Sequence, residues 1–218
     1  LKRKIVFDSL AIGMSPFLMN LAACFIVIII NQGLKKYGGD LAIGAFGIVN
    51  RLVFIVVMIV MGLNQGMQPI AGYNFGAKLY GRVNKVLRLT IIYATVVTTF
   101  GFLVGMLVPD LVVGIFTSDA ELTELSVTGL RITVMFFPII GFQMVTSNFF
   151  QSIGMAGKAI FLSLTRQMLI LLPCLLVLPQ FFGVAGVWYS MPVSDLLASL
   201  IALVMLVCQF RKFRTSPL

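Results

Sequence analysis

The sequence predicts an all-α membrane protein, a bundle of about six transmembrane helices. Composition is the first observation: 60% of the 218 residues are hydrophobic, 11% are charged, and the mean hydropathy is +1.07. Soluble domains carry roughly 25% charged residues, more than twice this share. The second observation is the order of the residues, in which long apolar runs alternate with short basic connections. A spanning helix needs about 20 apolar residues, so the length allows about six spans in one domain, residues 1–218.

The first half of the chain supplies three expected spans, at about residues 9–31, 41–69 and 89–108. A polar link at 32–40, with three glycines and two lysines, separates the first span from the second. A link at 78–88, with four basic residues and no acid, separates the second from the third.

The second half supplies three more expected spans, at about residues 127–152, 159–181 and 184–210. The polar connection before them holds four acids and no base, and Ser118 or Asp119 is suited to cap a short helix there. Pro138, Pro173 and Pro192 fall inside these spans and predict kinks.

Basic residues predict the orientation of the chain. The connections that share a side with both termini carry about a dozen Lys and Arg residues, whereas the other side carries Lys35, Lys36 and Arg131. The positive-inside rule therefore predicts that both termini are cytoplasmic. The chain starts at Leu1 with no signal peptide, so we expect it to be the later part of a longer polypeptide.

The composition argues against an enzyme and against a metal site. There is no histidine, the commonest general base and metal ligand. Cys24, Cys174 and Cys208 are isolated inside apolar runs, where we expect buried, inert thiols. The net charge of +9 is explained by membrane orientation, so we expect a lipid bilayer and no nucleic acid as a partner.

Glycines and amides mark the end of the second span, which reads GLNQGMQPIAGYNFGAK from Gly62 to Lys78. The stretch turns polar without turning charged. Small residues allow close helix packing in membranes and amides bond between helices, so we expect a helix end buried against other helices. The residues at fixed spacing are Gly62, Gly66, Gln68, Pro69, Gly72, Asn74, Gly76 and Ala77.

This spacing resembles the pattern that ends the second helix of a lobe in multidrug and toxic compound extrusion (MATE) transporters. Residues 149–154 resemble the end of the fourth helix in such a lobe, and residues 164–167, followed by Pro173, resemble the fifth. Residues 183–188, followed by Pro192 and Asp195, resemble the sixth, particularly in the MepA-like branch. The resemblance covers essentially the whole chain, as the C-terminal lobe of a transporter of about twelve helices.

The resemblance implies cation-coupled export of small, amphipathic, often cationic drugs by alternating access between two lobes. It also implies a multi-pass location in a prokaryotic cytoplasmic (inner) membrane. It implies a proton or sodium ion as the coupling ion and no other cofactor. The expected partner is an N-terminal lobe of six helices, or a second copy if this lobe stands alone. The family's coupling aspartate lies in the first lobe and cannot be assigned to this chain. Where some members place carboxylates in the second lobe, this chain has Asn20 and the amides between Gln143 and Asn148.

Six residues are candidates for a cavity that binds substrate or cation. Asp195 is the only acid deep in a span, where a charge costs roughly 2.5–3.5 kcal/mol. It either takes a proton or attracts a cationic drug, or it is a structural carboxylate beside Pro192. Arg51 either snorkels outward, pairs with Asp195, or contacts substrate. The remaining four either line the cavity or bond between helices: Asn20, Gln143, Ser147 and Asn148. Trp188 and Tyr189 are expected to anchor a helix at the membrane interface.

Three other functions compete with drug export. A lipid-linked oligosaccharide flippase of the same superfamily would need several cavity arginines for its phosphates, and only Arg51 and Arg166 qualify. A non-transporting helical module that assembles with a partner is the second alternative. An intramembrane enzyme is disfavoured because the sequence lacks histidine, paired acids and a nucleophile motif.

Overall fold

The computed structural model describes the backbone of residues 3–215 and the side chains of residues 14, 17, 18 and 20–210. Over this range it contains helices and short connections, with no strand. The expected basic residues before residue 14 and after residue 210 lie outside the described side chains. The elements in chain order are α1 (Arg3–Gly76), α2 (Tyr80–Leu107), α3 (Pro109–Gly114), α4 (Ala120–Val134), α5 (Phe137–Ser152), α6 (Ala156–Leu164), a π-helical segment η1 (Thr165–Leu171), α7 (Leu172–Phe182) and α8 (Val184–Thr215).

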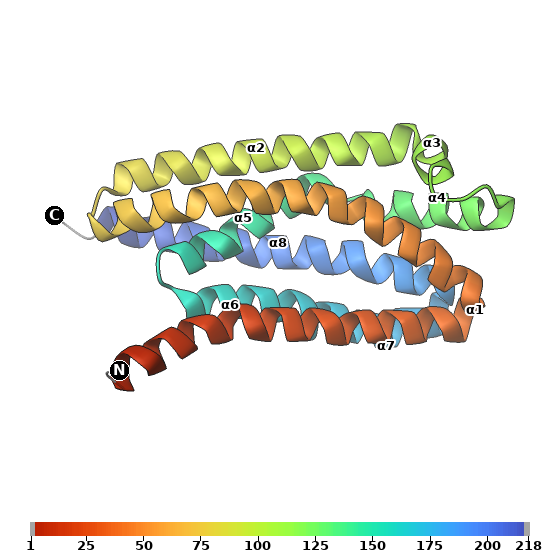
Figure 1. Ribbon diagram of the computed structural model, residues 1–218, viewed down its shortest axis with the longest axis horizontal. Helices are drawn as coiled ribbons and strands as arrows, with labels where there is room; N and C mark the ends of the chain where they lie inside the picture. Colours follow the sequence, from red (N-terminus) through yellow and green to blue (C-terminus); the bar gives the residue numbers. More distant parts are fainter. Residues whose placement is uncertain (1–2, 216–218) are drawn as a thin grey trace.

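The first element, α1, consists of two helical arms that meet at Gly39 (Figure 1). Gly39 has φ 69° and ψ −163°, a backbone conformation that glycine adopts and other residues avoid. The expected polar link at 32–40 was therefore wrong in extent, because the chain stays helical up to this single reversal. A helix pairs its backbone N–H and C=O groups internally, which is required in lipid. The two arms therefore remain helical beyond the apolar runs that predicted them.

Helix length supports repeated membrane crossing. Four described stretches are long and apolar enough to span: Asn20–Gly76, Tyr80–Leu107, Ala156–Phe182 and Val184–Phe210, and the bent pair α4–α5 makes a fifth. The first stretch would be about 85 Å long if it were straight, against a hydrocarbon core of about 30 Å, so its two arms count separately. Over residues 20–210 this arrangement agrees with the expected bundle of six.

Two of the three expected proline kinks lie next to an irregular segment. The chain bends by 55° between α4 and α5, just before Pro138 in the first turn of α5. A proline is tolerated in a first turn because its missing N–H would be unpaired there in any case. The π-helical segment η1 ends two residues before Pro173, whereas Pro192 lies inside α8 without a break.

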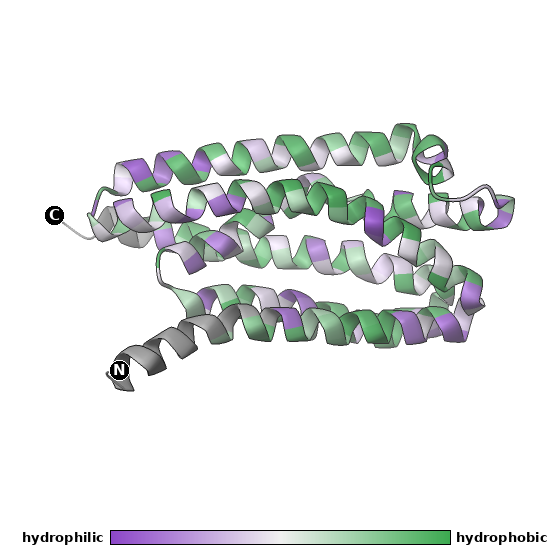
Figure 2. Ribbon diagram, in the orientation of Figure 1, coloured by the Kyte–Doolittle hydropathy of each residue, from purple (hydrophilic) through white to green (hydrophobic). Residues whose placement is uncertain are grey.

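The helices pack into a bundle whose first and last turns lie at the same end (Figure 1). Apolar residues, green in Figure 2, predominate along the helices. Asp119 caps α4, accepting a 3.0 Å hydrogen bond from the Leu122 backbone N–H, as expected. Cys24 and Cys208 are exposed and Cys174 is half-buried, so the expectation of three buried thiols was wrong.

Trp188 is part of the core and not an interfacial anchor. Its side chain is 2% exposed, and its ring centroid lies 6.0 Å from that of Phe46. Its ring also covers Gly129 on α4, where a β-carbon would lie 2.6 Å from the indole. The indole of Trp188 therefore packs α8 against α1 and α4. The next residue, Tyr189, is exposed.

Candidate functional site

A polar cavity of about 360 Å³ lies between the two arms of α1 and the segments α5, α6 and η1. Eleven of its fourteen lining residues are polar: Asn20, Asn64, Gln65, Gln68, Gln143, Ser147, Asn148, Gln151, Ser163, Arg166 and Gln167. None of the lining residues is acidic. We call this the amide cavity.

The amide cavity brings together four of the six candidate residues. Asn20 comes from the first arm of α1, and Gln143, Ser147 and Asn148 come from α5. Gln143 and Ser147 were expected on one helical face because they are four residues apart, and both line the cavity. Their transport role stays a prediction.

Some polar groups of the amide cavity are paired within the bundle. The Asn148 side-chain amide donates to the Met144 carbonyl at 3.0 Å. The Ser147 hydroxyl lies 3.4 Å from the Ser163 hydroxyl and 3.4 Å from the Ala159 carbonyl oxygen. The expected interhelical bonding is therefore present at Ser147, in addition to its place on the cavity wall.

Other polar groups there have no partner among the described residues. Asn64 is 4% exposed, and neither its amide nitrogen nor its carbonyl oxygen forms a hydrogen bond. The same is true of the side-chain oxygen of Gln167. A buried polar group without a partner costs roughly 1–3 kcal/mol, so these atoms suit a cavity that receives polar groups. Asn64 belongs to the amide-rich end of the second span, where the sequence predicted bonds between helices, so that expectation was wrong at Asn64 within the described structure. Neither Asn64 nor Gln167 was among the candidates for binding substrate or cation.

A second cavity, of about 350 Å³, lies next to the first. Ala23, Met144 and Arg166 line both cavities. The second cavity is mostly apolar, and Asp195 is the only acid that lines it. We call it the apolar chamber.

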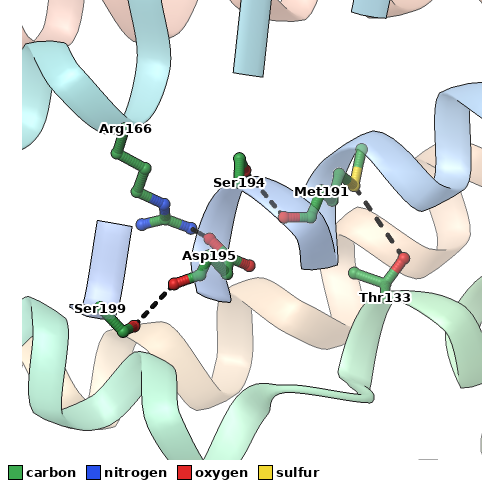
Figure 3. Close-up of polar contacts among 6 residues, drawn as sticks. All are labelled: Thr133, Arg166, Met191, Ser194, Asp195 and Ser199. Carbon is green, nitrogen blue, oxygen red and sulfur yellow. Dashed lines mark hydrogen bonds and ion pairs between the residues drawn. The ribbon is translucent and has the colours of Figure 1, made fainter. Parts of the chain in front are cut away.

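Arg166, which lines both cavities, forms an ion pair with Asp195 of the apolar chamber (Figure 3). Arg166 Nη2 lies 2.7 Å from Asp195 Oδ1, and the two side chains are 32% and 7% exposed, respectively. Removing one partner of a buried pair leaves an uncompensated charge, which costs far more than losing an exposed pair. The pair therefore ties α8 to the π-helical segment η1.

The predicted alternative in which Arg51 pairs with Asp195 was wrong. Arg51 is exposed and lines neither cavity. Sequence reasoning counted Arg166 among the basic residues of the cytoplasmic side and considered it only as a weak candidate for phosphate binding. One feature of the sequence could have identified Arg166 as a partner for Asp195: like Arg51, it is an arginine inside an apolar run.

The glycine-rich stretch forms the end of α1. Gln68 lines the amide cavity, and buried Asn74 donates to the Ile70 carbonyl at 2.8 Å. Close packing occurs at Gly72, where a β-carbon would lie 3.0 Å from the Ser152 carbonyl oxygen. It does not occur in the described structure at Gly62, Gly66 or Gly76, which have open space and are exposed, so the expected burial there was wrong within this lobe. Pro69 is also exposed.

Comparisons with known proteins agree with this architecture. Residues 14–176 match the profile of the MatE family. The multidrug export protein MepA of Staphylococcus aureus (strain MSSA476) is 28% identical over 201 residues, 92% of this chain and 44% of that protein. The MepA of Staphylococcus saprophyticus is 24% identical over the same length.

Solved structures show the same fold. The MATE multidrug transporter DinF-BH is 34% identical with a TM-score of 0.86. The match covers 99% of this chain and 48% of that one. An outward-facing MATE family transporter of the MOP superfamily matches at 19% identity with a TM-score of 0.90, which shows the fold alone. The chain thus spans about half the length of the relatives it matches.

Proposed function

Because this chain belongs to the MatE family, we propose that it forms one lobe of a multidrug efflux antiporter that works by alternating access. Its relatives are about twice as long, which supports a second lobe of similar size as its partner. An N-terminal lobe of the same transporter is the first candidate, and a second copy of this chain is the other.

The observation that carries the proposal is the amide cavity. Lipid offers no hydrogen bonds, so polar side chains within a membrane bundle face one another or a water-filled passage. Here eleven polar residues line one space, and the buried amide of Asn64 has no partner among the described residues. This arrangement suits a wall of a passage better than a packed structural core.

The mechanism we propose uses the irregular helices as bending points. Thr133 and Phe137, on either side of the 55° break between α4 and α5, line the apolar chamber, and Arg166 of the π-helical segment η1 lines both cavities. A change of partner at Asp195, the only acid lining either cavity, would bias the lobe between inward- and outward-open states. We propose a proton or a sodium ion as the coupling ion.

The proposed substrates are small amphipathic drugs, many of them cationic, carried across a prokaryotic cytoplasmic membrane. Both termini would face the cytoplasm, in keeping with the positive-inside rule. The flippase alternative is weaker, because Arg166 is the only basic residue that lines either cavity and it is already paired with Asp195.

The test uses the complete natural polypeptide that carries this lobe, reconstituted in vesicles with an encapsulated cationic dye. We expect dye transport under an imposed proton or sodium gradient and none without a gradient. Correctly folded protein that moves no dye under either gradient would contradict the proposal. For the role of Asp195, we expect Asp195→Asn to uncouple transport from the gradient. Unchanged gradient dependence would exclude it.

A further inference from the structure

We propose that the apolar chamber is a binding site for a compact lipophilic ammonium cation, and that Arg166 is a resident cation which this ligand displaces from Asp195. The inference deepens the proposed export function, on which it rests for the physiological role of the site. Binding itself requires neither a gradient nor transport.

The walls of the apolar chamber fit such a ligand. Its volume of about 350 Å³ is at the small end of ligand pockets, which run from about 300 to 1,000 Å³. Phe46, Phe54 and Phe137 contribute aromatic rings to the lining. Aromatic faces attract quaternary ammonium groups through their quadrupoles, and Asp195 adds the one negative charge.

Arg166 is placed to be exchanged rather than buried permanently. Its guanidinium contacts Asp195 through Nη2 at 2.7 Å, so the other N–H groups point elsewhere. The Arg166 side chain is 32% exposed, against 7% for Asp195. Since Arg166 lines both cavities, its guanidinium can move from the apolar chamber into the amide cavity without crossing a packed core.

The amide cavity offers Arg166 a second position. Asn64 is 4% exposed and Gln167 is adjacent in sequence to Arg166, and both present side-chain oxygens with no partner among the described residues. These oxygens can accept charge-assisted hydrogen bonds from a guanidinium. The carboxylate would then exchange Arg166 for the ligand while both cations keep partners, so no buried charge is left alone.

The backbone at Arg166 also favours a movable side chain. Arg166 is the second residue of the π-helical segment η1. Such segments are rare, weaken the regular hydrogen-bond ladder and recur at functional sites.

The experiment measures equilibrium binding of phenyltrimethylammonium to the complete polypeptide in nanodiscs, without any gradient. Its neutral carbon isostere, tert-butylbenzene, separates the effect of charge from that of shape. We expect the wild type to bind the cation more tightly than the isostere. We expect Arg166→Gln to tighten cation binding, by about tenfold if Arg166 occupies Asp195 about nine tenths of the time. A structural salt bridge alone predicts the opposite, because losing it would disorder the chamber.

Three further proteins complete the design. Asp195→Asn should lose the preference for the cation over the isostere. The double variant Asp195→Asn/Arg166→Gln removes both charges together, leaves no unpaired buried charge, and should also show no preference. Arg51→Gln removes an exposed arginine outside both cavities and should bind like the wild type.

Two outcomes would overturn the proposal. One is a folded Arg166→Gln protein that binds the cation no more tightly than the wild type. The other is a double variant that still prefers the cation, and this result decides the matter if Arg166→Gln does not fold. Binding as expected without dye transport would refute only the export function. Transport without this binding pattern would refute only the site.

Discussion

At the scale of single residues, the contact between Asp195 and Arg166 is the one on which the proposals depend most. The two side chains form the one salt bridge among the described residues, and it joins α8 to η1. A buried pair is weak evidence for stability, since well-packed apolar residues often stabilise a protein as much. Its position between two cavities is what the proposed ligand exchange requires.

Gly129 provides a test of the core at this scale. A β-carbon there would lie 2.6 Å from the Trp188 ring, which is buried and cannot move aside. We expect Gly129→Ala to lower the free energy of unfolding by about 1–3 kcal/mol through overpacking. The measurement is thermal unfolding of the purified protein in detergent.

Gly47 is the matched control, since it is helical and a β-carbon there meets no atom within 4 Å. Gly47→Ala should stabilise the protein by about 0.5–1 kcal/mol, because alanine has less backbone entropy to lose. Equal effects of the two substitutions would contradict the described position of Trp188.

The same residues show what the sequence could and could not predict. The spacing of Gln143 and Ser147 fixes them on one helical face, so their shared cavity was predictable. The partner of Asp195 was not, because pairing depends on how α8 and η1 are rotated against each other. Trp188 was misassigned because a helix that is apolar all round marks no inward face in its sequence.

At the scale of elements, the reversal of α1 is the sharpest local feature. Apolar runs predicted both arms, but no pattern showed that a single residue would replace the expected link. Gly38, next to the reversal, allows close packing. A β-carbon there would lie 2.7 Å from the side chain of Val184, so the first residue of α8 packs directly against the reversal in α1.

Gly39 carries the corresponding prediction. Because its φ of 69° and ψ of −163° belong to a glycine-only region, we expect Gly39→Ala to cost about 1–3 kcal/mol. Thermal unfolding and the yield of folded protein from membranes would measure this cost. Gly114→Ala, with open space and no positive φ, is the control and should be close to neutral. A stable Gly39→Ala protein would mean that the arms are joined differently.

At the scale of the whole molecule, the distribution of charge predicts the orientation of the chain in the membrane. The α1–α2 connection carries Lys78, and Arg82 and Lys85 follow in the first turns of α2, whereas the connection between α3 and α4 carries Asp119 and no base. Helix order places these two connections at opposite ends of the bundle (Figure 1).

Cysteine labelling on intact cells tests this orientation. In a chain whose three native cysteines are replaced by serine, we expect Ser118→Cys to react with a membrane-impermeant maleimide. Lys78→Cys should react only after the cells are opened, because the positive-inside rule keeps its connection in the cytoplasm. Both sites are exposed, so access depends on the membrane alone. The reverse pattern would invert the topology.

The π-helical segment at 165–171 makes the chain sensitive to length at this point. Such a segment contains one residue more than an α-helix of the same span would hold. Deleting one residue there would restore regular winding and rotate everything before it by about 100° relative to α7. Arg166 would then point away from Asp195. The ion pair of this lobe therefore depends on the number of residues in this segment as well as on the presence of an arginine and an aspartate.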